Sequence, residues 1–444
     1  MTDTPGGDTG DQGPEGPNPF KGTPFEQFFG GGVPDLNAIF SQMQSLLQPH
    51  EGPINWDLAI DGARKLVAQQ PDPSPSQRQK DAVADAIRLA DHWLDDATGF
   101  PSGVHTTAAW SRAEWVVNTT GVWKVLVEPV VSHLVTAMSA AIPGDAQAMA
   151  GPLLGMLERM TGLMVAGQVG SALGGLAGEV LSASDIGLPL GPAGTAAVLT
   201  TNVSEFAEGL DVEESDLLLY LALREAAHQR LFAHVPWLRD HLIGAVADYA
   251  GGIEIDVTGL EDQMKSLDIS NPTALQDALQ GGMFEPQPTP AQTAALQRLE
   301  VTLALVEGWV DEVVGQATSG RMPAASRLQE AFRRRRAAGG PAEETFASLV
   351  GLELRPRRLR DASALWGSLR TRQGAEARDG VWMHPDLLPT AADLDDPLGF
   401  REGATAPAEL SDDEFDAELR SLLDGPAEGG SEGGAPSGGD EPTA

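Results

Sequence analysis

The residues whose types and spacing could do chemistry are concentrated in one segment, Arg224-Glu225-Ala226-Ala227-His228. In the motif H-E-x-x-H, two histidines one helical turn apart hold a zinc ion, and the glutamate activates a metal-bound water. Glu225 and His228 occupy the second and fifth positions of that motif, but Arg224 occupies the first. A guanidinium has no lone pair for a metal and carries a permanent positive charge. The segment therefore predicts the frame of a zinc site from which one ligand is missing.

The helix that must position these residues is predicted to begin at Asp211, with Glu213 and Glu214 in a first turn where acids favour the helix dipole. Its core-facing stripe, at steps of three and four, consists of Leu217, Leu221, Arg224, His228 and Leu231. Arg224 and His228 thus share the face that the leucines direct towards the interior. A buried cation is costly unless it is paired, so this face requires an anion opposite it.

A second helix, predicted from about Ala294 to Ala317, offers that anion. Its core-facing stripe consists of Leu296, Leu303, Glu307, Val310 and Val314. Glu307 stands where an apolar residue would be expected, and Gly308 beside it permits the close approach of another backbone. We expect the two helices to pack together, with the Glu307 carboxylate within about 8 Å of the Arg224 and His228 side-chain heads, because direct hydrogen bonds need about 3 Å.

Three segments together resemble the actinobacterial zincin-like proteins, a family of zinc-dependent metalloproteases or hydrolases of unknown substrate. The segments are Arg224 to Leu242, Ser270-Asn271-Pro272 and Leu305 to Asp311, and the likeness extends from about Trp110 to Phe400. The resemblance implies a mainly α fold with a zincin-like helical domain. It also implies a zinc site made by two motif histidines and a downstream glutamate.

By position in the motif, the resemblance makes Glu225 the general base, His228 the second zinc ligand and Glu307 the third. Arg224 departs from the pattern. His228 and Glu307 alone would supply two protein ligands where catalytic zinc sites use three. Zn²⁺ is therefore a cofactor that the resemblance implies, and one that we expect this chain to lack.

Two function classes follow. In the one that we favour, the active site is degenerate and the protein is a pseudoenzyme that binds a peptide or a protein partner in the former substrate cleft. Arg224 would then form a salt bridge with Glu307 or Glu225, replacing the charge of the metal with its own.

In the alternative class, the protein is an active zinc-dependent metalloprotease or hydrolase with Glu225 as general base. Its metal would be held by His228, Glu307 and one further ligand, for which His234 and His241 are the candidates. The dipeptide Val235-Pro236 is expected to end the motif helix, so the direction of these two histidines is left open.

Composition excludes several other classes. The 444 residues include no cysteine, which rules out disulfides, thiolate zinc sites and cysteine nucleophiles. The net charge of −35 opposes binding to nucleic acid and to anionic membranes. The amino-terminal residues lack the basic and apolar regions of a signal peptide, so a cytoplasmic location is expected.

One basic region stands against this acidic background. It comprises Arg333, Arg334, Arg335, Arg336, Arg355, Arg357, Arg358 and Arg360. Such a region could hold phosphates, but it lacks the interleaved aromatic residues of a nucleic-acid platform. We expect these arginines to form a solvated helix face or to neutralise the acidic tail, and we expect no nucleic-acid partner.

The remaining elements are predicted to be helices, because apolar residues recur at steps of three and four. The predicted helices are Leu36 to Leu47, Ile54 to Ala68, Gln77 to Trp93 and Trp115 to Ala141. The best candidate strand is Gly252 to Val257. The uncharged run from Thr161 to Gly178 is barely long enough for a membrane span, and charged residues flank it at both ends. We interpret it as a core helix whose glycines permit close packing.

The chain is expected to contain one helical zincin-like domain, over residues 35–402, between two tails. Residues 1–34 are rich in Gly and Pro and are predicted to be disordered. Residues 403–444 form an acidic, Gly-rich tail, also predicted to be disordered, within which Ser411 to Leu419 could form one short helix.

Overall fold

A computed structural model describes residues 52–140, 162–252, 289–337 and 358–401, together with positions 345 and 349. Both predicted tails lie outside these residues. So do the helix predicted at Leu36 to Leu47, the short helix predicted at Ser411 to Leu419, and all but the first residue of the strand predicted at Gly252 to Val257.

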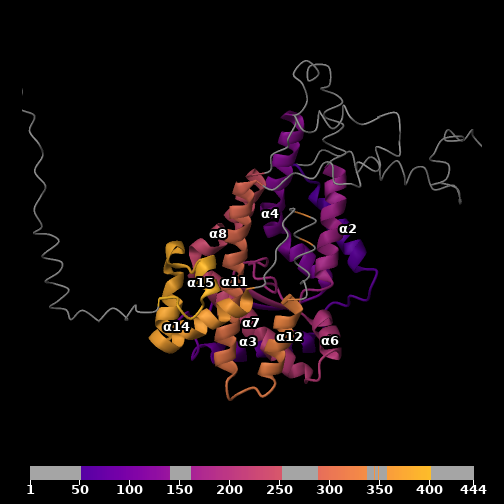
Figure 1. Cartoon of the computed structure of the whole chain (residues 1–444). Helices are drawn as coiled ribbons and strands as arrows, with labels where there is room; N and C mark the ends of the chain where they lie inside the picture. The colour runs from indigo at the N-terminus through magenta and orange to yellow at the C-terminus, as the bar shows by residue number, and fades with distance from the viewer. Residues whose placement is uncertain are drawn as a thin grey trace, which may run out of the picture.

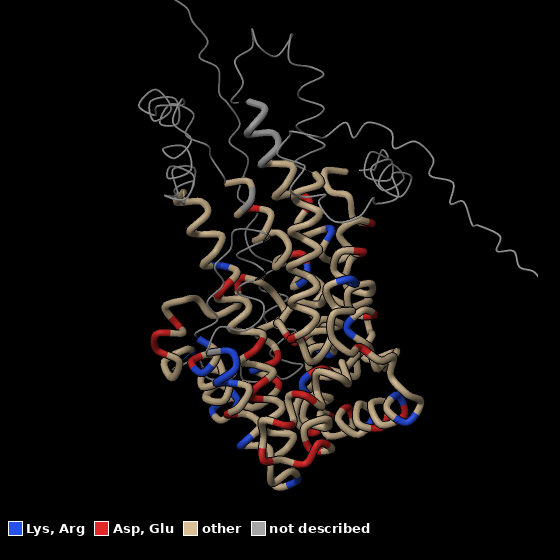
Figure 2. Tube along the Cα trace, turned by 90° about the vertical axis from the view of Figure 1, so that its right-hand side faces the viewer, with Lys and Arg blue, Asp and Glu red and all other residues tan. Residues whose placement is uncertain are grey.

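The described part of the chain is mainly α, as predicted, and Figure 1 shows helices packed side by side around α7 and α11. The helices are α2 (Trp56–Val67), α3 (Gln77–Leu94), α4 (Arg112–Ala140), α6 (Thr200–Glu208), α7 (Glu214–His234), α8 (Pro236–Gly251), α11 (Pro290–Thr318), α12 (Ala325–Ala337), α14 (Leu359–Gly380) and α15 (Ala391–Asp395). Two 3-10 helices, Val381–Met383 and Pro385–Leu387, lie between α14 and α15. Along the trace, basic and acidic residues are interspersed (Figure 2).

Side-chain caps explain where several helices begin. Ser76 and Gln79 form a reciprocal capping box at the start of α3, and Thr289 and Gln292 do the same for α11. The predicted cap of α7 is wrong: the helix is preceded by Glu213 rather than Asp211, and the backbone carbonyl of Glu213 accepts the first helical hydrogen bonds. Acidic residues in the first turn still favour the helix dipole.

A two-stranded parallel sheet was not predicted. Strand β1 (Thr106–Trp110) pairs with β2 (Thr195–Leu199), from Thr106 opposite Thr195 to Trp110 opposite Leu199. β2 leads directly into α6, and four of its five residues are buried. Strands of five residues that are rich in alanine show neither the alternation nor the β-branched composition on which sequence patterns depend.

Residues 162–177 form a helix that packs on α2 through its glycines. A Cβ added at Gly170 would lie 2.6 Å from the carbonyl oxygen of Ala59, and one at Gly174 would lie 2.9 Å from the side chain of Leu66. One face of this helix is thus buried by close backbone contact, as predicted, while Met164 on the other face is exposed. No helix in the described part of the chain is long and apolar enough to cross a membrane.

The centre of the core is the pair α7 and α11. Every residue of α11 from 302 to 314, and every residue of α7 from 220 to 231, is buried. Gly308 lets α14 approach α11 closely, because a Cβ there would lie 2.5 Å from the Cβ of Ala362 and 2.8 Å from the backbone nitrogen of Ser363. The close approach predicted at Gly308 is therefore confirmed, with α14 as the neighbouring helix.

We expect Gly308→Ala to destabilise the protein by about 1–3 kcal/mol, because the added methyl group overlaps backbone atoms that cannot move aside. Denaturant unfolding of the full chain measures this. Gly121→Ala is the matched control: Gly121 also lies inside a helix, but nothing is within 4 Å of an added Cβ. The control should be neutral or stabilising by about 0.5–1 kcal/mol, and equal effects of the two substitutions would contradict the packing argument.

Candidate functional site

The structure brings Arg224, His228 and Glu307 together between α7 and α11. Arg224 Nη2 donates to Glu307 Oε2 at 2.5 Å, and His228 Nε2 lies 3.0 Å from Glu307 Oε1. The side chains of Arg224 and Glu307 are 5% and 1% exposed. The packing of α7 against α11 was predicted from the polar residues that interrupt their apolar stripes, and the structure confirms it. The distances between these side chains are those of direct hydrogen bonds.

The second ring nitrogen of His228 is also engaged. Nδ1 lies 2.9 Å from the backbone carbonyl oxygen of Arg224, one turn earlier in α7. A carbonyl only accepts, so Nδ1 carries the proton in this contact, and the ionised Glu307 carboxylate likewise accepts from Nε2–H, which leaves neither ring nitrogen with a lone pair for a metal.

A further cation, Arg336, reaches the same carboxylate from α12. Its Nη2 lies 2.9 Å from Glu307 Oε1 and also donates to the backbone carbonyl of Asp185. A Cβ added at Gly187, where φ is +79°, would lie 3.0 Å from Glu307 Oε1. A glycine is therefore required where this loop passes the site.

The predicted solvated arginine face on α12 is wrong for three of its four members. Arg333 donates to Asp311 at 2.5 Å, Arg335 donates to Asp185 at 2.8 Å, and Arg336 pairs with Glu307. Arg334 does face solvent, where it pairs with Glu330. The reason is that α12 lies over carboxylates presented by α11 and by the segment before β2, so its arginines have partners inside the protein.

An aromatic residue of α12 completes the surroundings of Arg224. The guanidinium lies over the ring of Phe332 at 5.3 Å from the ring centroid. The same ring contacts Tyr220 and Phe206, each at a centroid distance of 5.5 Å. A guanidinium stacks well on an aromatic face, so Arg224 has a specific place in the core.

The opposite charges in this cluster each stabilise the ionised form of the other. Burial alone would raise the pKa of Glu307, but the positive charges of Arg336, Arg224 and His228 outweigh it and hold that pKa at about 2. Burial alone would likewise lower the pKa of Arg224, but the charge of Glu307 raises it above its ordinary value. The carboxylate and the guanidinium therefore both stay charged at neutral pH.

Glu225, the base of the motif, lies in a different set of contacts. It accepts hydrogen bonds from the backbone nitrogen of Ser184 at 3.0 Å and from Gln229 Nε2 at 3.0 Å. Its side chain is fully buried, and burial raises its pKa despite these hydrogen bonds and the nearby His228. None of the hydrogen bonds to Glu225 comes from Arg224, so Glu307 is the partner that Arg224 adopts.

The two candidate substitute ligands lie elsewhere. His234 is exposed at the end of α7 and stacks on Phe100 at 6.0 Å, and His241 on α8 contacts the edge of Trp237 at 5.5 Å. α7 ends and α8 begins at Val235-Pro236, as predicted. Within the residues that the structure describes, no three histidine, aspartate or glutamate side chains are arranged to hold a metal ion.

These donors do not fit a catalytic zinc ion. Both oxygens of Glu307 accept from cationic side chains, and the first ligand position holds a guanidinium. The positive charges of Arg224 and Arg336 at this carboxylate oppose the approach of a metal cation.

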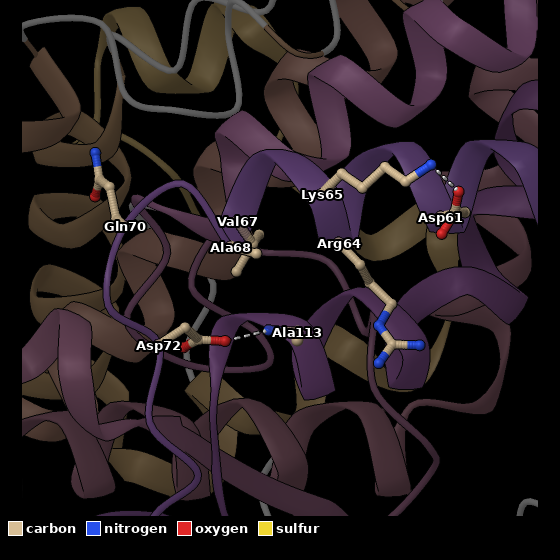
Figure 3. Close-up of a pocket in the computed structure, with 8 residues that line it drawn as sticks. All are labelled: Asp61, Arg64, Lys65, Val67, Ala68, Gln70, Asp72 and Ala113. Carbon is tan, nitrogen blue, oxygen red and sulfur yellow. Dashed lines mark hydrogen bonds and ion pairs between the residues drawn. The ribbon is translucent and has the colours of Figure 1, made fainter. Parts of the chain in front are cut away.

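A hollow of about 540 Å³, shown in Figure 3, is lined by none of the residues of this cluster. It is lined by residues of α2, of the segment that follows it and of the start of α4: Asp61, Arg64, Lys65, Val67, Ala68, Gln70, Asp72 and Ala113. Asp72 accepts from the backbone nitrogens of Arg112 and Ala113, at 2.9 Å each, and so caps α4. These contacts are structural, and none of the lining residues belongs to the motif.

Comparisons with known proteins match the chain over most of its length. A family model for zincin-like metallopeptidases matches residues 54–400. One solved structure, described as "a putative hydrolase with a novel fold from Chloroflexus aurantiacus", aligns with a TM-score of 0.56 and 19% identity. The alignment covers 78% of this chain and 96% of that chain, and at this identity it shows a shared fold. No protein of curated function matches.

A double-mutant cycle on Arg224→Met and Glu307→Gln should give a coupling energy of about 1–3 kcal/mol in denaturant unfolding, because the pair is buried and hydrogen-bonded. The control cycle uses Asp85 and Arg88, a pair whose side chains are 69% and 71% exposed. Its coupling should stay below about 0.5 kcal/mol. Similar coupling energies for the two pairs would contradict the role given to Arg224.

The contribution of Glu307 to the free energy of unfolding should also depend on pH. Its pKa is lower in the folded protein, at about 2, than the ordinary value of 4.5 expected for the unfolded chain. The stabilisation is therefore complete above the unfolded value and is lost as the pH falls from there towards the folded value. We expect the difference in unfolding free energy between wild type and Glu307→Gln to shrink over that window. A difference that stays constant with pH would show that the carboxylate charge is not what stabilises the fold.

Proposed function

Because the chain belongs to the zincin-like metallopeptidase family, we propose that it keeps the helical frame of that family without the metal. The active site is degenerate, and the protein acts by binding a peptide or a protein partner rather than by hydrolysis. The contact between Arg224, Arg336 and Glu307 is the observation that carries this proposal.

Charge balance at Glu307 supports this function. Two guanidinium groups bring two positive charges to Glu307, which is the charge that a zinc ion would bring to the same carboxylate. The ion pairs therefore replace the electrostatic role of the metal. They cannot replace its chemistry, since a guanidinium offers no open coordination position and does not generate a metal-bound hydroxide.

The surroundings of Glu225 support the same conclusion. A general base must reach the water or substrate proton that it abstracts, at about 3 Å or through one water. The Glu225 carboxylate is fully buried and is occupied by Ser184 and Gln229. In this arrangement it holds α7 to the segment around Ser184.

Nucleic acid is not the partner proposed. The three inward arginines of α12 are paired with Asp311, Asp185 and Glu307, and Arg360 is paired with Glu330. Phosphates would have to displace these carboxylates one by one. Binding a polypeptide is the activity that a peptidase frame without its metal can still perform.

The alternative, an active zinc-dependent hydrolase with Glu225 as base, is favoured by the family and by the raised pKa of Glu225, which suits acid–base chemistry. It requires Arg224 and Arg336 to leave Glu307, and Glu225 to exchange its partners for water. Metal content distinguishes the two functions.

We expect wild-type protein, purified without a His-tag, to contain well under one zinc per chain and to show no peptidase activity that chelators abolish. The reason is that the Arg224 and Arg336 charges oppose a cation at Glu307. Metal analysis and a fluorogenic peptide assay with and without chelator measure this. Stoichiometric zinc that disappears in His228→Ala would overturn the proposal in favour of the active hydrolase.

A gain-of-metal series provides the matched control. Arg224→His restores the first imidazole but should bind zinc poorly, because Arg336 still pairs with Glu307. The double substitution Arg224→His with Arg336→Gln removes both obstacles and should bind zinc more tightly, by a factor of about 10 or more, since tight zinc binding needs three deprotonated protein ligands. Equal affinity of the single and double variants would show that Arg336 does not block the metal.

A further inference from the structure

The way α12 is attached to the core differs along its length. At its amino end the anchors are buried apolar residues: Leu328 within the helix, and Met322 and Ala324 in the segment before it. Towards its carboxyl end the attachment is largely ionic, through Arg333, Arg335 and Arg336. The amino end is therefore fixed by apolar burial, whereas the carboxyl end is held mostly by charge.

The surface beneath the carboxyl half of α12 is polar. It presents the carboxylates of Asp185, Glu307 and Asp311 and the guanidinium of Arg224, with Phe332 as the buried apolar contact of this half. The three arginines remain partly exposed, from 12% for Arg336 to 25% for Arg333. Each pair joins a partly exposed guanidinium to a buried carboxylate, so water and salt reach its cationic side and weaken it more than they would a fully buried pair. This interface should open more readily than the apolar contact between α7 and α11.

The carboxyl turns of α12 also contain contacts that favour a helix. Arg334, Arg335 and Arg336 lie in its last turn, where cations favour the helix dipole, and Glu330 pairs with Arg334 one turn away. Because Leu328 is buried at the amino end, the carboxyl half can lift only if α12 bends between Leu328 and Phe332.

We propose that α12 is a lid, whose carboxyl half lifts away from the core and opens the Arg224–Glu307 centre to solvent and ligands. In the closed state Phe332 covers Arg224 and Arg336 covers Glu307. Lifting exposes the face of α7 that carries the motif. This inference rests on the proposed function, because it gives the degenerate site a route by which a partner reaches it.

The test uses the absence of cysteine from the chain, which makes a single introduced thiol unambiguous. Ser363 lies beneath α12: its Oγ donates to Asp311 at 2.8 Å and accepts from Arg333 at 3.4 Å. In the full chain carrying Ser363→Cys, the rate of labelling by a thiol reagent reports opening of the lid. Ser102→Cys, at an exposed position, gives the intrinsic labelling rate.

Arg336→Gln should accelerate labelling at position 363 by about 5- to 30-fold, since that is the change in an opening equilibrium when one good ion pair is lost. Arg336 does not contact Ser363, so the effect must pass through the carboxyl half of α12. Arg334→Gln, on the same helix but 77% exposed, should leave the rate unchanged. High salt should accelerate labelling in the wild-type background.

Low urea concentrations should leave the labelling rate at position 363 almost unchanged, because a lid exposes little surface compared with global unfolding. Labelling that follows the urea dependence of global unfolding would overturn the proposal. So would equal effects of Arg336→Gln and Arg334→Gln. Zinc content, measured on the same samples, tests the proposed function separately: a zinc-loaded protein with an opening α12 would refute the degenerate site and leave the lid standing.

Discussion

A carboxylate in the middle of a helical core must be neutralised, and the arrangement around Glu307 follows from that requirement. Glu307 lies on a stretch of α11 that is buried on every side. Arg224 comes to it from α7 and Arg336 from α12, and His228 occupies the remaining direction. An uncompensated charge at this depth would cost several kcal/mol. The relative positions of three helices are therefore coupled to a single side chain. Gly187 lies close to Glu307, and Phe332 lies against Arg224.

Under the proposed function, Glu307 occupies a position at which a zincin-like site would hold a metal ion, and in this chain it balances guanidinium groups instead. That exchange would preserve the packing of α7 on α11, because the charge opposite Glu307 is positive in both cases. It changes what the site can do, since a guanidinium binds carboxylates and does not activate water. We infer that the fold has kept its electrostatic design while its chemistry has moved from hydrolysis towards recognition.

The sequence predicted the pairing of α7 with α11 because Arg224, His228 and Glu307 interrupt two apolar stripes at helical spacing, and such interruptions must meet. It did not predict that Arg336 pairs with Glu307. Four consecutive arginines are typical of a solvated face, and only the path of the chain after α11 brings α12 over Asp311 and Glu307. The strands β1 and β2 were missed for a related reason: their pairing joins residues almost ninety positions apart, and nothing in five alanine-rich residues indicates it. Local sequence patterns identify which face of a helix is buried, whereas contacts between residues far apart in the sequence depend on the topology of the whole fold.

The most direct measurement is anomalous diffraction at the zinc edge from crystals of the full chain soaked in excess zinc. We expect no anomalous peak between His228 and Glu307, with Arg224 and Arg336 still paired with the carboxylate. An ordered zinc ion at about 2.0–2.2 Å from His228 Nε2 and a Glu307 oxygen, with Arg224 displaced, would contradict it.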